Sequence, residues 1–260
     1  MNILITGAAS GIARRVIEKL DAKQHHIYVA VHTTKQLELV QLRYHNLKHI
    51  TCLKLDITDE KDRKQIESLP IDILVSNAAI GYSGSIAEIP IDLVRDNFDV
   101  NVFSNFSLVQ LALKGMIQRK HGRVIMMSSL AGVAPVPFLG SYCASKASIN
   151  MLTSNLRLEM KLLKANIDVI TIQPGLYYTG FNQVMTENKY GRMNLDTYFK
   201  TQLEFLKKYE TPFYHLLESK NLDQIANKIV KAIDSKHPRA IYRSRISQIL
   251  FVKLYSLLFC

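Results

Sequence analysis

Two side chains four residues apart, Tyr142 and Lys146, carry the strongest chemical signal in this sequence of 260 residues. They fall at the start of a predicted helix over Ser141–Lys164, where residues four apart share one face. A phenol is a poor base near neutrality, because its ordinary pKa is about 10. A lysine ammonium about 4 Å away would favour the phenolate by roughly 4 kcal/mol at an effective dielectric constant of about 20. The pair therefore predicts a tyrosine that exchanges protons as a general acid or base.

Two further polar residues are candidates for the same site. Ser129 follows the predicted strand Arg123–Ser128, at the carboxyl edge of the sheet where ligands bind in α/β folds. Its hydroxyl can hydrogen-bond an oxygen on which negative charge develops. Asn101 lies in a long predicted helix, and we expect its side-chain amide to order a water molecule that links Lys146 to solvent. The predicted catalytic set is Asn101, Ser129, Tyr142 and Lys146.

A glycine-containing turn near the start of the chain is the second chemical signal. The first predicted strand runs into Thr6-Gly7-Ala8-Ala9-Ser10-Gly11-Ile12-Ala13, and this segment opens a helix. Gly7 permits a tight turn, and Gly11 permits close approach of the backbone to a pyrophosphate. The unpaired N–H groups and the positive dipole end of the helix favour an anion. In this strand–turn–helix context the motif indicates a dinucleotide site, with Gly7, Ser10, Gly11 and Ile12 as predicted contacts.

The end of the second predicted strand bears on which dinucleotide binds. Enzymes specific for NAD usually place an acidic residue there to bind the ribose 2′-hydroxyl. In this chain the strand ends Val29-Ala30-Val31-His32-Thr33-Thr34-Lys35, and no acidic residue occurs before Glu38. His32 and Thr33 can instead hydrogen-bond or pair with a 2′-phosphate. The sequence therefore favours NADP(H), with NAD(H) as the alternative.

Short apolar runs alternate with amphipathic segments of helical length along the chain. The predicted strands are Asn2–Thr6, Ile27–Val31, Ile50–Leu55, Ile73–Ser76, Arg123–Ser128, Asp168–Gln173 and Arg239–Tyr242. The predicted helices are Gly11–Leu20, Lys35–Tyr44, Glu60–Ser68, Asp92–Arg119, Ser141–Lys164 and Leu222–Ser235. This alternation predicts an α/β fold, a single doubly wound domain of Rossmann type with a seven-stranded parallel sheet and helices on both faces.

One segment interrupts the alternation. Residues 179–221, between the sixth and seventh predicted strands, form a long, aromatic-rich and helix-prone insertion within the single domain 1–260. Long insertions of this kind usually serve as lids or docking surfaces. We expect this insertion to cover the substrate, and its aromatic residues favour a lipophilic substrate.

Composition and charge narrow the functional classes. The formal net charge is +11, which favours an anionic partner such as a phosphorylated cofactor, an acidic substrate, a membrane surface or nucleic acid. The basic residues are scattered and no aromatic-basic motif accompanies them, so nucleic-acid binding is not expected. Cys52, Cys143 and Cys260 have neither metal-ligand nor redox-motif spacing. We therefore expect reduced thiols, no metal site and a cytoplasmic protein.

The apolar and basic C-terminal tail is open to three interpretations. Residues Ile246–Cys260 are interrupted by Gln248 and Lys253, and no run reaches the roughly 18 apolar residues that a transmembrane helix needs. Core packing, an oligomer contact and weak association with a membrane surface would each use such a segment. No signal peptide is expected, because Met1–Thr6 has the pattern of a strand and lacks a charged n-region.

Taken together, these residues resemble the short-chain dehydrogenase/reductase family over nearly the whole chain. The glycine turn is similar to the family's cofactor turn, although Ala13 stands where a third glycine is usual. The predicted catalytic set matches the family's tetrad in type and order. The segment Ser76-Asn77-Ala78-Ala79 is similar to the family's Asn-Asn-Ala-Gly motif and departs from it at the first and the last position.

The resemblance implies cofactor contacts beyond the glycine turn. Asp56-Ile57-Thr58 resembles the segment in which the Asp contacts the adenine amino group. Pro174-Gly175, followed by Thr179, is similar to the element that holds the nicotinamide carboxamide. The further contacts implied in this way are Asp56, Ile57, Asn77, Ala78, Tyr142, Lys146, Pro174, Gly175 and Thr179.

The function implied by the resemblance is that of an NADP(H)-dependent oxidoreductase. Such an enzyme transfers a hydride between the nicotinamide and a carbonyl or secondary alcohol, while Tyr142 exchanges the proton. Family members are commonly dimers or tetramers, so a homo-oligomer is expected. The alternative is a non-catalytic protein that senses NADP(H) with the same fold, although such a sensor has no need of Tyr142, Lys146 and Ser129. Fold and tetrad do not name the substrate.

Overall fold

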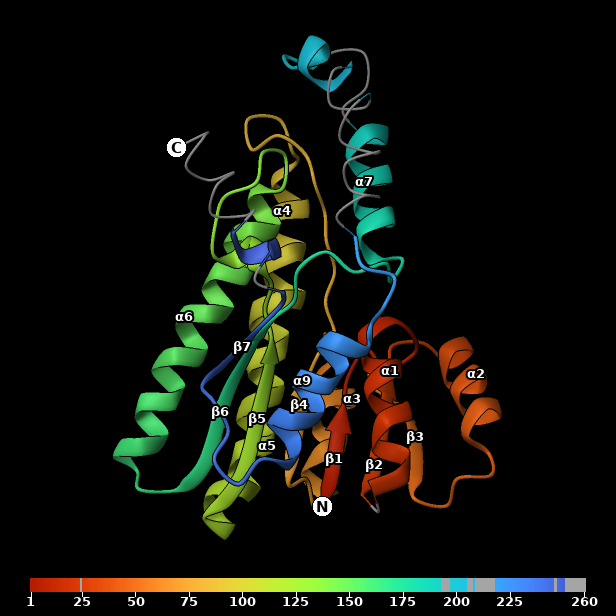
Figure 1. The fold of residues 1–260 in the computed structure, drawn as a ribbon, viewed down its shortest axis with the longest axis vertical. Coiled ribbons are helices and arrows are strands. Elements are labelled where there is room, and N and C mark those ends of the chain that lie inside the picture. Colours follow the sequence, from red (N-terminus) through yellow and green to blue (C-terminus); the bar gives the residue numbers. More distant parts are fainter. Residues whose placement is uncertain (24, 193–196, 205–207, 209–217, 246, 251–260) are drawn as a thin grey trace.

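Seven parallel strands form one sheet in the computed structural model of the chain (Figure 1). The structure describes residues 1–23, 25–192, 197–204, 208, 218–245 and 247–250. The strands are β1 (Asn2–Ile5), β2 (His26–Val31), β3 (Ile50–Lys54), β4 (Ile73–Ser76), β5 (His121–Met127), β6 (Asn166–Gln173) and β7 (Ile241–Arg243). Their order is β3-β2-β1-β4-β5-β6-β7, and every neighbouring pair is parallel. The predicted Rossmann-type sheet is confirmed.

Helices connect the strands, as the alternation predicts. The longer ones are α1 (Gly11–Leu20), α2 (Thr34–Tyr44), α3 (Glu60–Lys64), α4 (Ile91–Phe98), α5 (Asn105–Arg119), α6 (Gly140–Leu162), α7 (Phe181–Arg192) and α9 (Asp223–Asp234). The helix predicted over Asp92–Arg119 is divided, because a π-helical segment, η3 (Asp99–Ser104), joins α4 to α5. The helix predicted over Glu60–Ser68 ends in a 3-10 turn, η2 (Gln65–Ser68).

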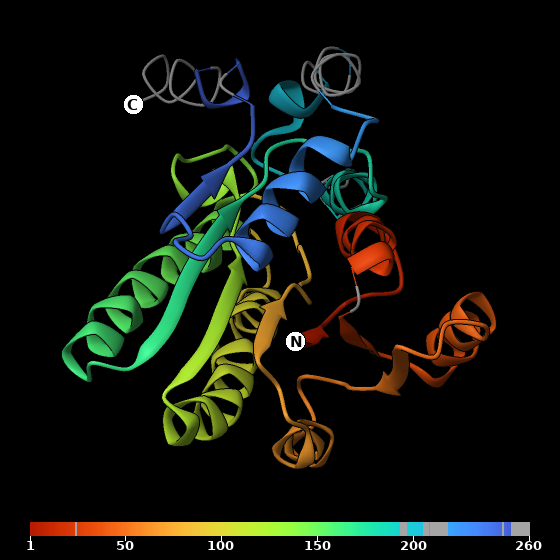
Figure 2. The same cartoon turned by 60° about the horizontal axis from the view of Figure 1, so that its bottom comes forward.

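The sheet has an apolar core on each face, because successive side chains of a strand point to opposite sides. In β1, Ile3 and Ile5 face a core formed with α1, α2 and α9. Leu4 faces the other core, to which α5 and α6 contribute. Figure 2 shows α1 and α9 on one side of the sheet and α5 and α6 on the other. The doubly wound arrangement with helices on both faces is therefore present.

The strand order reverses between β1 and β4, and this reversal marks where ligands bind in doubly wound sheets. The turns that follow β1, β4, β5 and β6 all leave the carboxyl edge of the sheet, which is uppermost in Figure 1. Every predicted site residue follows one of the strands or lies on a helix that starts at this edge. The fold thus gathers the candidates at one end of the molecule.

The insertion predicted over residues 179–221 begins at the same edge. Its helix α7 rises away from the sheet above β1 and α1 (Figure 1). Residues 193–196, 205–207 and 209–217 of the insertion lie outside the described residues. The tail Ile246–Cys260 is described only at 247–250, and the predictions for its other residues lie outside the described residues. Among the helices that the structure describes, none is both long and apolar enough to cross a membrane.

Candidate active site

The glycine turn follows β1 and opens α1. Gly7 and Gly11 have φ angles of +61° and +60°, a conformation that side-chain-bearing residues rarely adopt. A Cβ atom on Gly7 would lie 2.9 Å from the Ala78 Cα atom, and one on Gly11 would lie 3.3 Å from the Thr179 Cβ atom. Both glycines are therefore required by their backbone conformation and by the closeness of the segments around Ala78 and Thr179.

The N-terminus of α1 fits an anionic group. Ser10 occupies the N-cap position without making a side-chain capping bond, and the first turn of α1 contains no acidic residue. Ser10 is exposed and Ile12 is half-buried. Backbone N–H groups at a positive dipole end, free of competing carboxylates, are what a pyrophosphate requires. A nicotinamide dinucleotide, when bound, would donate a hydride in a reduction or accept one in an oxidation, and Gly7 to Ile12 would hold its phosphates.

Thr6 ties the glycine turn to the segment after β4. Its Oγ1 atom accepts hydrogen bonds from the backbone N–H groups of Asn77 (2.9 Å) and Ala78 (3.0 Å). The Asn77 Nδ2 atom in turn donates to the Thr6 carbonyl at 3.0 Å. The structure therefore places Asn77 and Ala78 against the turn. Sequence reasoning does not single out Thr6, because a threonine at the end of a strand carries no spacing signal.

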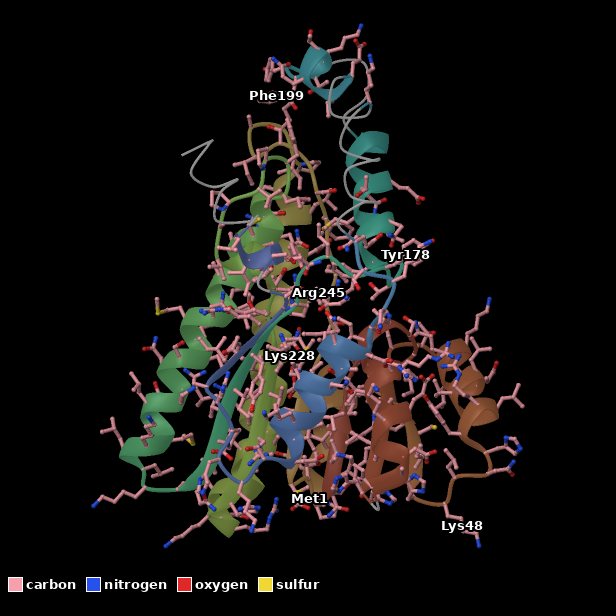
Figure 3. All side chains as sticks on the ribbon, in the orientation of Figure 1. Met1, Lys48, Tyr178, Phe199, Lys228 and Arg245 are labelled. Carbon is pink, nitrogen blue, oxygen red and sulfur yellow. The ribbon has the colours of Figure 1, made fainter. Side chains whose placement is uncertain are left out.

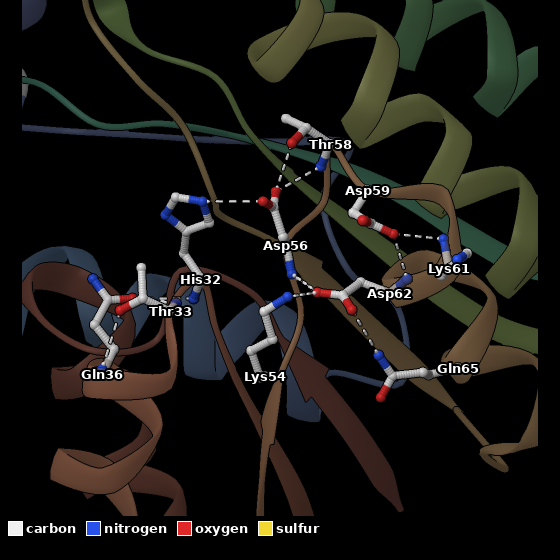
Figure 4. Close-up of polar contacts among 10 residues, drawn as sticks. All are labelled: His32, Thr33, Gln36, Lys54, Asp56, Thr58, Asp59, Lys61, Asp62 and Gln65. Carbon is white, nitrogen blue, oxygen red and sulfur yellow. Dashed lines mark hydrogen bonds and ion pairs between the residues drawn. The ribbon is translucent and has the colours of Figure 1, made fainter.

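His32 and Asp56 lie at the ends of neighbouring strands, and their side chains are hydrogen-bonded with 3.2 Å between Nε2 and Oδ2 (Figure 4). Asp56 Oδ1 also accepts hydrogen bonds from the Thr58 backbone N–H (2.9 Å) and hydroxyl (2.7 Å). Burial alone would raise the pKa of Asp56, but the bonds from Thr58 and the neighbouring His32 bring the pKa below its usual range. The His32 side chain is 65% exposed, whereas Ile57 is buried.

Thr33 has a structural use that the sequence prediction does not include. It is the N-cap of α2, and its hydroxyl accepts a hydrogen bond from the Gln36 backbone N–H at 3.2 Å. The Gln36 side chain returns to the Thr33 backbone N–H, which completes a capping box. Thr33 thus fixes the start of α2, and only the remaining capacity of its hydroxyl is available to a ligand.

Arg43 is a site candidate that sequence reasoning does not find. From the last turn of α2, its Nη1 atom donates to the Ala9 carbonyl of the glycine turn at 3.2 Å. Arg43 is exposed, and no ion pair of Arg43 occurs in the part of the chain that the structure describes. The guanidinium thus contacts the glycine turn, and it also lies 6.0 Å from the centre of the Tyr44 ring. An arginine near the end of an amphipathic helix ordinarily faces solvent, so the sequence gives no signal for this contact.

Tyr142, in the first turn of α6, lies beside Ser129 at the end of β5. The Ser129 hydroxyl accepts a hydrogen bond from the Ala131 backbone N–H at 3.1 Å and lies close enough to the Tyr142 phenol to lower its pKa. Tyr142 is 8% exposed. Its apolar surroundings are Leu139, Cys143 and Met185, with Ala131, Val136 and Phe181 packed against them. The structure therefore brings two of the predicted catalytic residues into contact in a dry environment.

Lys146 lies one helical turn beyond Tyr142, and its side chain is buried. The Lys146 Nζ atom donates to the Met127 carbonyl at 3.0 Å and lies 5.7 Å from the centre of the Tyr142 ring. The Lys146 carbonyl accepts a hydrogen bond from the Ser128 hydroxyl at 2.9 Å. These contacts join α6 to the end of β5, so that the ammonium and the phenol lie on the same side of the helix.

The pKa values of this pair differ from the expectation. Burial raises the pKa of Tyr142 above its usual range, and the neighbouring Ser129 hydroxyl offsets only part of that rise. Burial lowers the pKa of Lys146 to about 7. The prediction that Lys146 makes the phenol acidic is wrong for the chain by itself, because it counted the attraction between the two charges and omitted the cost of removing each from water. Near neutral pH the phenol keeps its proton.

Asn101 lies in the π-helical segment, and its side-chain amide is hydrogen-bonded to other groups of the protein. Its Oδ1 atom accepts from the Ile80 N–H (2.9 Å), while Nδ2 donates to the Ile80 carbonyl (2.9 Å) and to the Ser145 hydroxyl (3.0 Å). Both amide donors are taken, so only the second lone pair of Oδ1 is left for the water molecule that the sequence predicts. The bonds of Asn101 position the loop after β4 against α6, one residue before Lys146.

Asn97 and Asn105 repeat this arrangement one turn before and one turn after. The Asn97 amide pairs with the N–H and the carbonyl of Tyr82, both at 3.0 Å, and Nδ2 donates to the Ser141 hydroxyl at 2.6 Å. The Asn105 Nδ2 atom donates to the Ala78 carbonyl at 3.0 Å. The loop after β4 is therefore held at alternate residues by side chains of one continuous helix.

We call Asn97, Asn101 and Asn105 the asparagine ladder, and all three residues are buried. Two of its amides also reach across to hydroxyls of α6, those of Ser141 and Ser145. These serines belong to the same two turns of α6 as the catalytic phenol and ammonium. The sequence does contain a signal for the ladder, because asparagines at positions i, i+4 and i+8 must share one face of a helix.

The segment Pro174–Thr179 links the catalytic residues to the glycine turn. The Pro174 carbonyl accepts a hydrogen bond from the Leu130 N–H at 2.8 Å, within the turn that Ser129 caps. At its other end, Thr179 packs against Gly11. The structure therefore places Thr179 beside the glycine turn.

A series of side-chain hydrogen bonds connects β6 and β7 to the turn that begins at Ser129. The Asn150 Nδ2 atom donates to the Gly132 carbonyl at 2.9 Å, and its Oδ1 atom accepts from Gln173 Nε2 at 3.0 Å. The Gln173 Oε1 atom accepts from Arg243 Nε at 2.8 Å. Because these partners lie far apart in sequence, spacing alone gives no indication that Asn150 and Gln173 support the serine turn.

The described part of the insertion contacts the same site. The Phe181 ring of α7 lies 5.7 Å from the Tyr142 ring. Met185, one turn further along α7, is buried, and its carbonyl accepts a hydrogen bond from the Ser83 hydroxyl at 2.5 Å. Further along, the Phe199 ring packs edge-on against Phe138 at 5.4 Å. These contacts place apolar side chains of the insertion over the phenol.

Comparison with known proteins agrees with this geometry. A family model described as short chain dehydrogenase matches residues 1–190. The chain is 28% identical to the probable short-chain type dehydrogenase/reductase VdlC of Helicobacter pylori, over 98% of this chain and 92% of that protein. It is 34% identical to the uncharacterized oxidoreductase YusZ of Bacillus subtilis, over 68% of this chain and 65% of that protein.

A relative with a more specific description is the NADPH-dependent 3-dehydrocapnine reductase of Ornithobacterium rhinotracheale. The identity is 31% over 66% of this chain and 64% of that reductase, so the match spans just under two thirds of it. Among solved structures, a short chain dehydrogenase/reductase from Burkholderia phymatum in complex with NAD has a TM-score of 0.80 at 20% identity, covering 97% of this chain and 92% of the other. A serine dehydrogenase complexed with NADP+ has a TM-score of 0.77 at 19% identity, covering 95% and 96%.

These matches identify the class of protein. The chain belongs to the short-chain dehydrogenase/reductase family and is an oxidoreductase of that family. Solved structures with this fold hold either NAD or NADP.

Proposed function

We propose that this protein is an NADP(H)-dependent oxidoreductase that transfers a hydride between the nicotinamide and a carbonyl or secondary alcohol of a lipophilic substrate. The observation that carries the proposal is the buried Tyr142 phenol, which lies beside Ser129 and one helical turn before Lys146. Apolar side chains of α7 lie over the phenol, which favours a substrate that is itself apolar around its reactive oxygen.

Tyr142 is suited to act as the proton donor in the direction of carbonyl reduction. Negative charge develops on the carbonyl oxygen as a hydride reaches the carbon, and the phenol then gives that oxygen its proton. The Ser129 hydroxyl stabilises the same oxygen by a hydrogen bond. Lys146, whose pKa of about 7 makes both of its protonation states accessible near neutrality, restores the proton to the tyrosinate. In the direction of alcohol oxidation each proton transfer is reversed.

Features at the adenosine end support NADP(H). The exposed His32 imidazole follows β2, and the Arg43 guanidinium donates to the Ala9 carbonyl of the glycine turn. An arginine near this position accommodates a 2′-phosphate, whereas a carboxylate would repel it. No acidic residue follows β2 before Glu38. One relative is described as NADPH-dependent. NAD(H) is the alternative cofactor.

Self-association through α6 is part of the proposal. Met151, Leu158 and Leu162 are 64%, 58% and 83% exposed, and their spacing places them along one face of the helix. Exposed apolar stripes of this kind mark protein contacts. We therefore infer a homodimer or homotetramer in which α6 packs against a second copy.

A cytoplasmic location is proposed from the cysteine spacing alone.

The proposed function is tested by following nicotinamide absorbance with a panel of carbonyl compounds and secondary alcohols of increasing hydrophobicity. We expect oxidation of NADPH at least tenfold faster than oxidation of NADH, with activity rising as the substrate becomes more apolar. Binding of NADPH without turnover of any carbonyl or alcohol would instead support a protein that senses NADP(H). Faster turnover with NADH would replace the proposed cofactor.

A further inference from the structure

We infer that Ser244 and Gln248, in the segment after β7, position the turn Gly175–Tyr177 and thereby the part of the site that receives the nicotinamide. The inference rests on the proposed function, because the nicotinamide end of the site is itself proposed. Neither residue follows a motif of the family resemblance, and both lie more than sixty positions along the chain from that turn. We call Tyr177, Ser244 and Gln248 the C-terminal clamp.

Gln248 contacts the turn directly. Its side chain is buried, and its Nε2 atom donates to the Leu176 carbonyl at 3.1 Å. Its Oε1 atom accepts a hydrogen bond from the Ser244 hydroxyl. The same Oε1 atom fills the space beside Gly175, because a Cβ atom there would lie only 2.1 Å away. A larger residue at position 175 would displace Gln248, so this glycine is needed for the clamp itself.

Ser244 connects Gln248 to the other end of the turn. Its Oγ atom lies 3.0 Å from the Tyr177 phenolic oxygen, and both residues are buried. The Ser244 backbone N–H donates to the Gln173 carbonyl at 3.0 Å, which extends the pairing of β6 and β7 by one more bond. Buried polar groups are expensive to leave unpaired, so these bonds hold the turn in a single arrangement.

The turn is held from the opposite side by the end of the insertion. The Ser219 N–H donates to the Leu176 carbonyl at 3.0 Å, and the Tyr178 N–H donates to the Ser219 carbonyl at 3.1 Å. The Leu176 carbonyl thus accepts two hydrogen bonds, one from Ser219 and one from Gln248. A carbonyl oxygen has two lone pairs, so this group is fully satisfied only when both supports are in place.

The clamp is anchored to the body of the fold by α9. The Lys228 Nζ atom donates to the carbonyls of Arg243 (2.6 Å) and Ser244 (3.2 Å). Figure 3 shows Lys228 and Arg245 one above the other on this side of the molecule, with Tyr178 at the base of α7. The position of Ser244 is therefore set by a packed helix, which makes it a firm support for the turn.

The clamp should affect binding of the nicotinamide half of the cofactor more than binding of its adenosine half. The glycine turn and the residues after β2 and β3 would hold the adenosine half, and none of the clamp contacts involves them. Replacing Gln248 removes one donor from the Leu176 carbonyl and the acceptor of the Ser244 hydroxyl, which loosens only the Gly175–Tyr177 turn. We therefore expect weaker binding of a complete dinucleotide and unchanged binding of its adenosine half.

The test compares two ligands on the full-length protein. NADPH is titrated by its fluorescence and 2′,5′-ADP by calorimetry, with NADH and 5′-AMP as a parallel pair. For Gln248→Leu we expect the Kd of the complete dinucleotide to rise about tenfold, the scale of a lost buried hydrogen bond, while the Kd of the adenosine ligand stays within twofold. Gln118→Ala, an exposed glutamine of α5, is the matched control and should leave both values unchanged.

Ser244→Ala provides a second, smaller change that leaves Gln248 in place. It removes the hydroxyl between Tyr177 and Gln248 and should weaken the complete dinucleotide about threefold, again without affecting the adenosine ligand. Equal weakening of both ligands in these variants, or no weakening of either, would overturn the inference while leaving the proposed function intact. A wild-type protein that binds neither NADPH nor NADH would overturn the proposed function and the inference together.

Discussion

The two ends of the candidate site are built in different ways. The phosphate end (Gly7–Ile12 with the residues after β2 and β3) uses backbone N–H groups, a helix terminus and glycine conformations. The catalytic end (Ser129, Tyr142, Lys146 and Pro174–Thr179) is held by buried side chains from α4 to α6 and from the C-terminal segment. The phosphate end therefore presents backbone groups of one local turn to its ligand, whereas the catalytic end presents side chains that contacts between distant parts of the chain hold in place.

This difference has an energetic consequence. At the phosphate end, removing one side chain leaves the backbone donors of the turn in place. At the catalytic end, removing one buried partner leaves a polar group without a hydrogen bond, which costs about 1–3 kcal/mol. Substitutions at the two ends should therefore affect different measurements, cofactor selectivity at the first and stability or turnover at the second.

The largest effect is expected for Tyr142→Phe, which removes the proton donor and keeps the ring. Turnover should fall by about 10³-fold or more, toward the upper range for loss of a general acid, while the Kd for NADPH changes by less than about threefold. Stopped-flow absorbance and a binding titration measure the two quantities. Turnover within tenfold of wild type would remove Tyr142 from the proposed role.

The next largest effect is expected for Asn97→Ala, which removes one member of the asparagine ladder. The Tyr82 backbone groups and the Ser141 hydroxyl would lose their partner, so the free energy of unfolding should fall by about 2–4 kcal/mol. Denaturant unfolding measures the change. Asn46→Ala, at an exposed position, is the control and should shift the free energy by less than about 0.5 kcal/mol. Similar values for the two variants would contradict the positioning role.

The lowered pKa of Lys146 predicts a dependence of stability on pH. The unfolded lysine has an ordinary pKa of 10.5, whereas the folded value is about 7, so between these values the unfolded state binds more protons. Stability should therefore rise from pH 7 to pH 9, by at most about 1.4 kcal/mol per pH unit. Denaturant unfolding at pH 7, 8 and 9 measures this slope. Lys146→Met should flatten it, and an equal slope in both proteins would show that other groups cause it.

The smallest effect is expected at the phosphate end. Arg43→Ala should weaken NADPH about fivefold to tenfold relative to NADH, because one charged partner of the 2′-phosphate is lost. His32→Asp should shift the preference further toward NADH by introducing a repelling carboxylate. Ratios of kcat/KM for the two cofactors measure both. Arg95→Ala, which breaks an exposed ion pair with Asp92 on α4, should leave the ratio unchanged; an unchanged ratio in all three variants would refute the NADP(H) assignment at this end.

Much of the fold could be predicted from the sequence, because each strand is a short apolar run and each helix has its own periodicity. The helix Gly11–Leu20 and the strand Ile73–Ser76 agree with the prediction residue for residue. The division of the helix over Asp92–Arg119 was not predicted, since a π-helical segment preserves the apolar periodicity on both sides of it.

The candidate site was predictable where a residue acts through its neighbours in sequence. The glycine turn and the Tyr142–Lys146 pair are of this kind. The sign of the Tyr142 pKa shift was not predictable, because it depends on how completely the phenol is buried. Arg43 and Gln248 were missed for a related reason, since each acts on a backbone carbonyl that is distant in sequence.

The π-helical segment Asp99–Ser104 makes the length of this stretch as important as its composition. A step of four residues overshoots one turn of an α-helix by about 40°, and a wider π turn rotates less per residue. A helix that combines α-helical and π-helical turns keeps Asn97, Asn101 and Asn105 aligned with the loop after β4. Deleting one residue here would rotate everything downstream on α5 by about 100°. Natural variants of this chain should therefore tolerate exchanges of residues in this stretch far better than insertions or deletions.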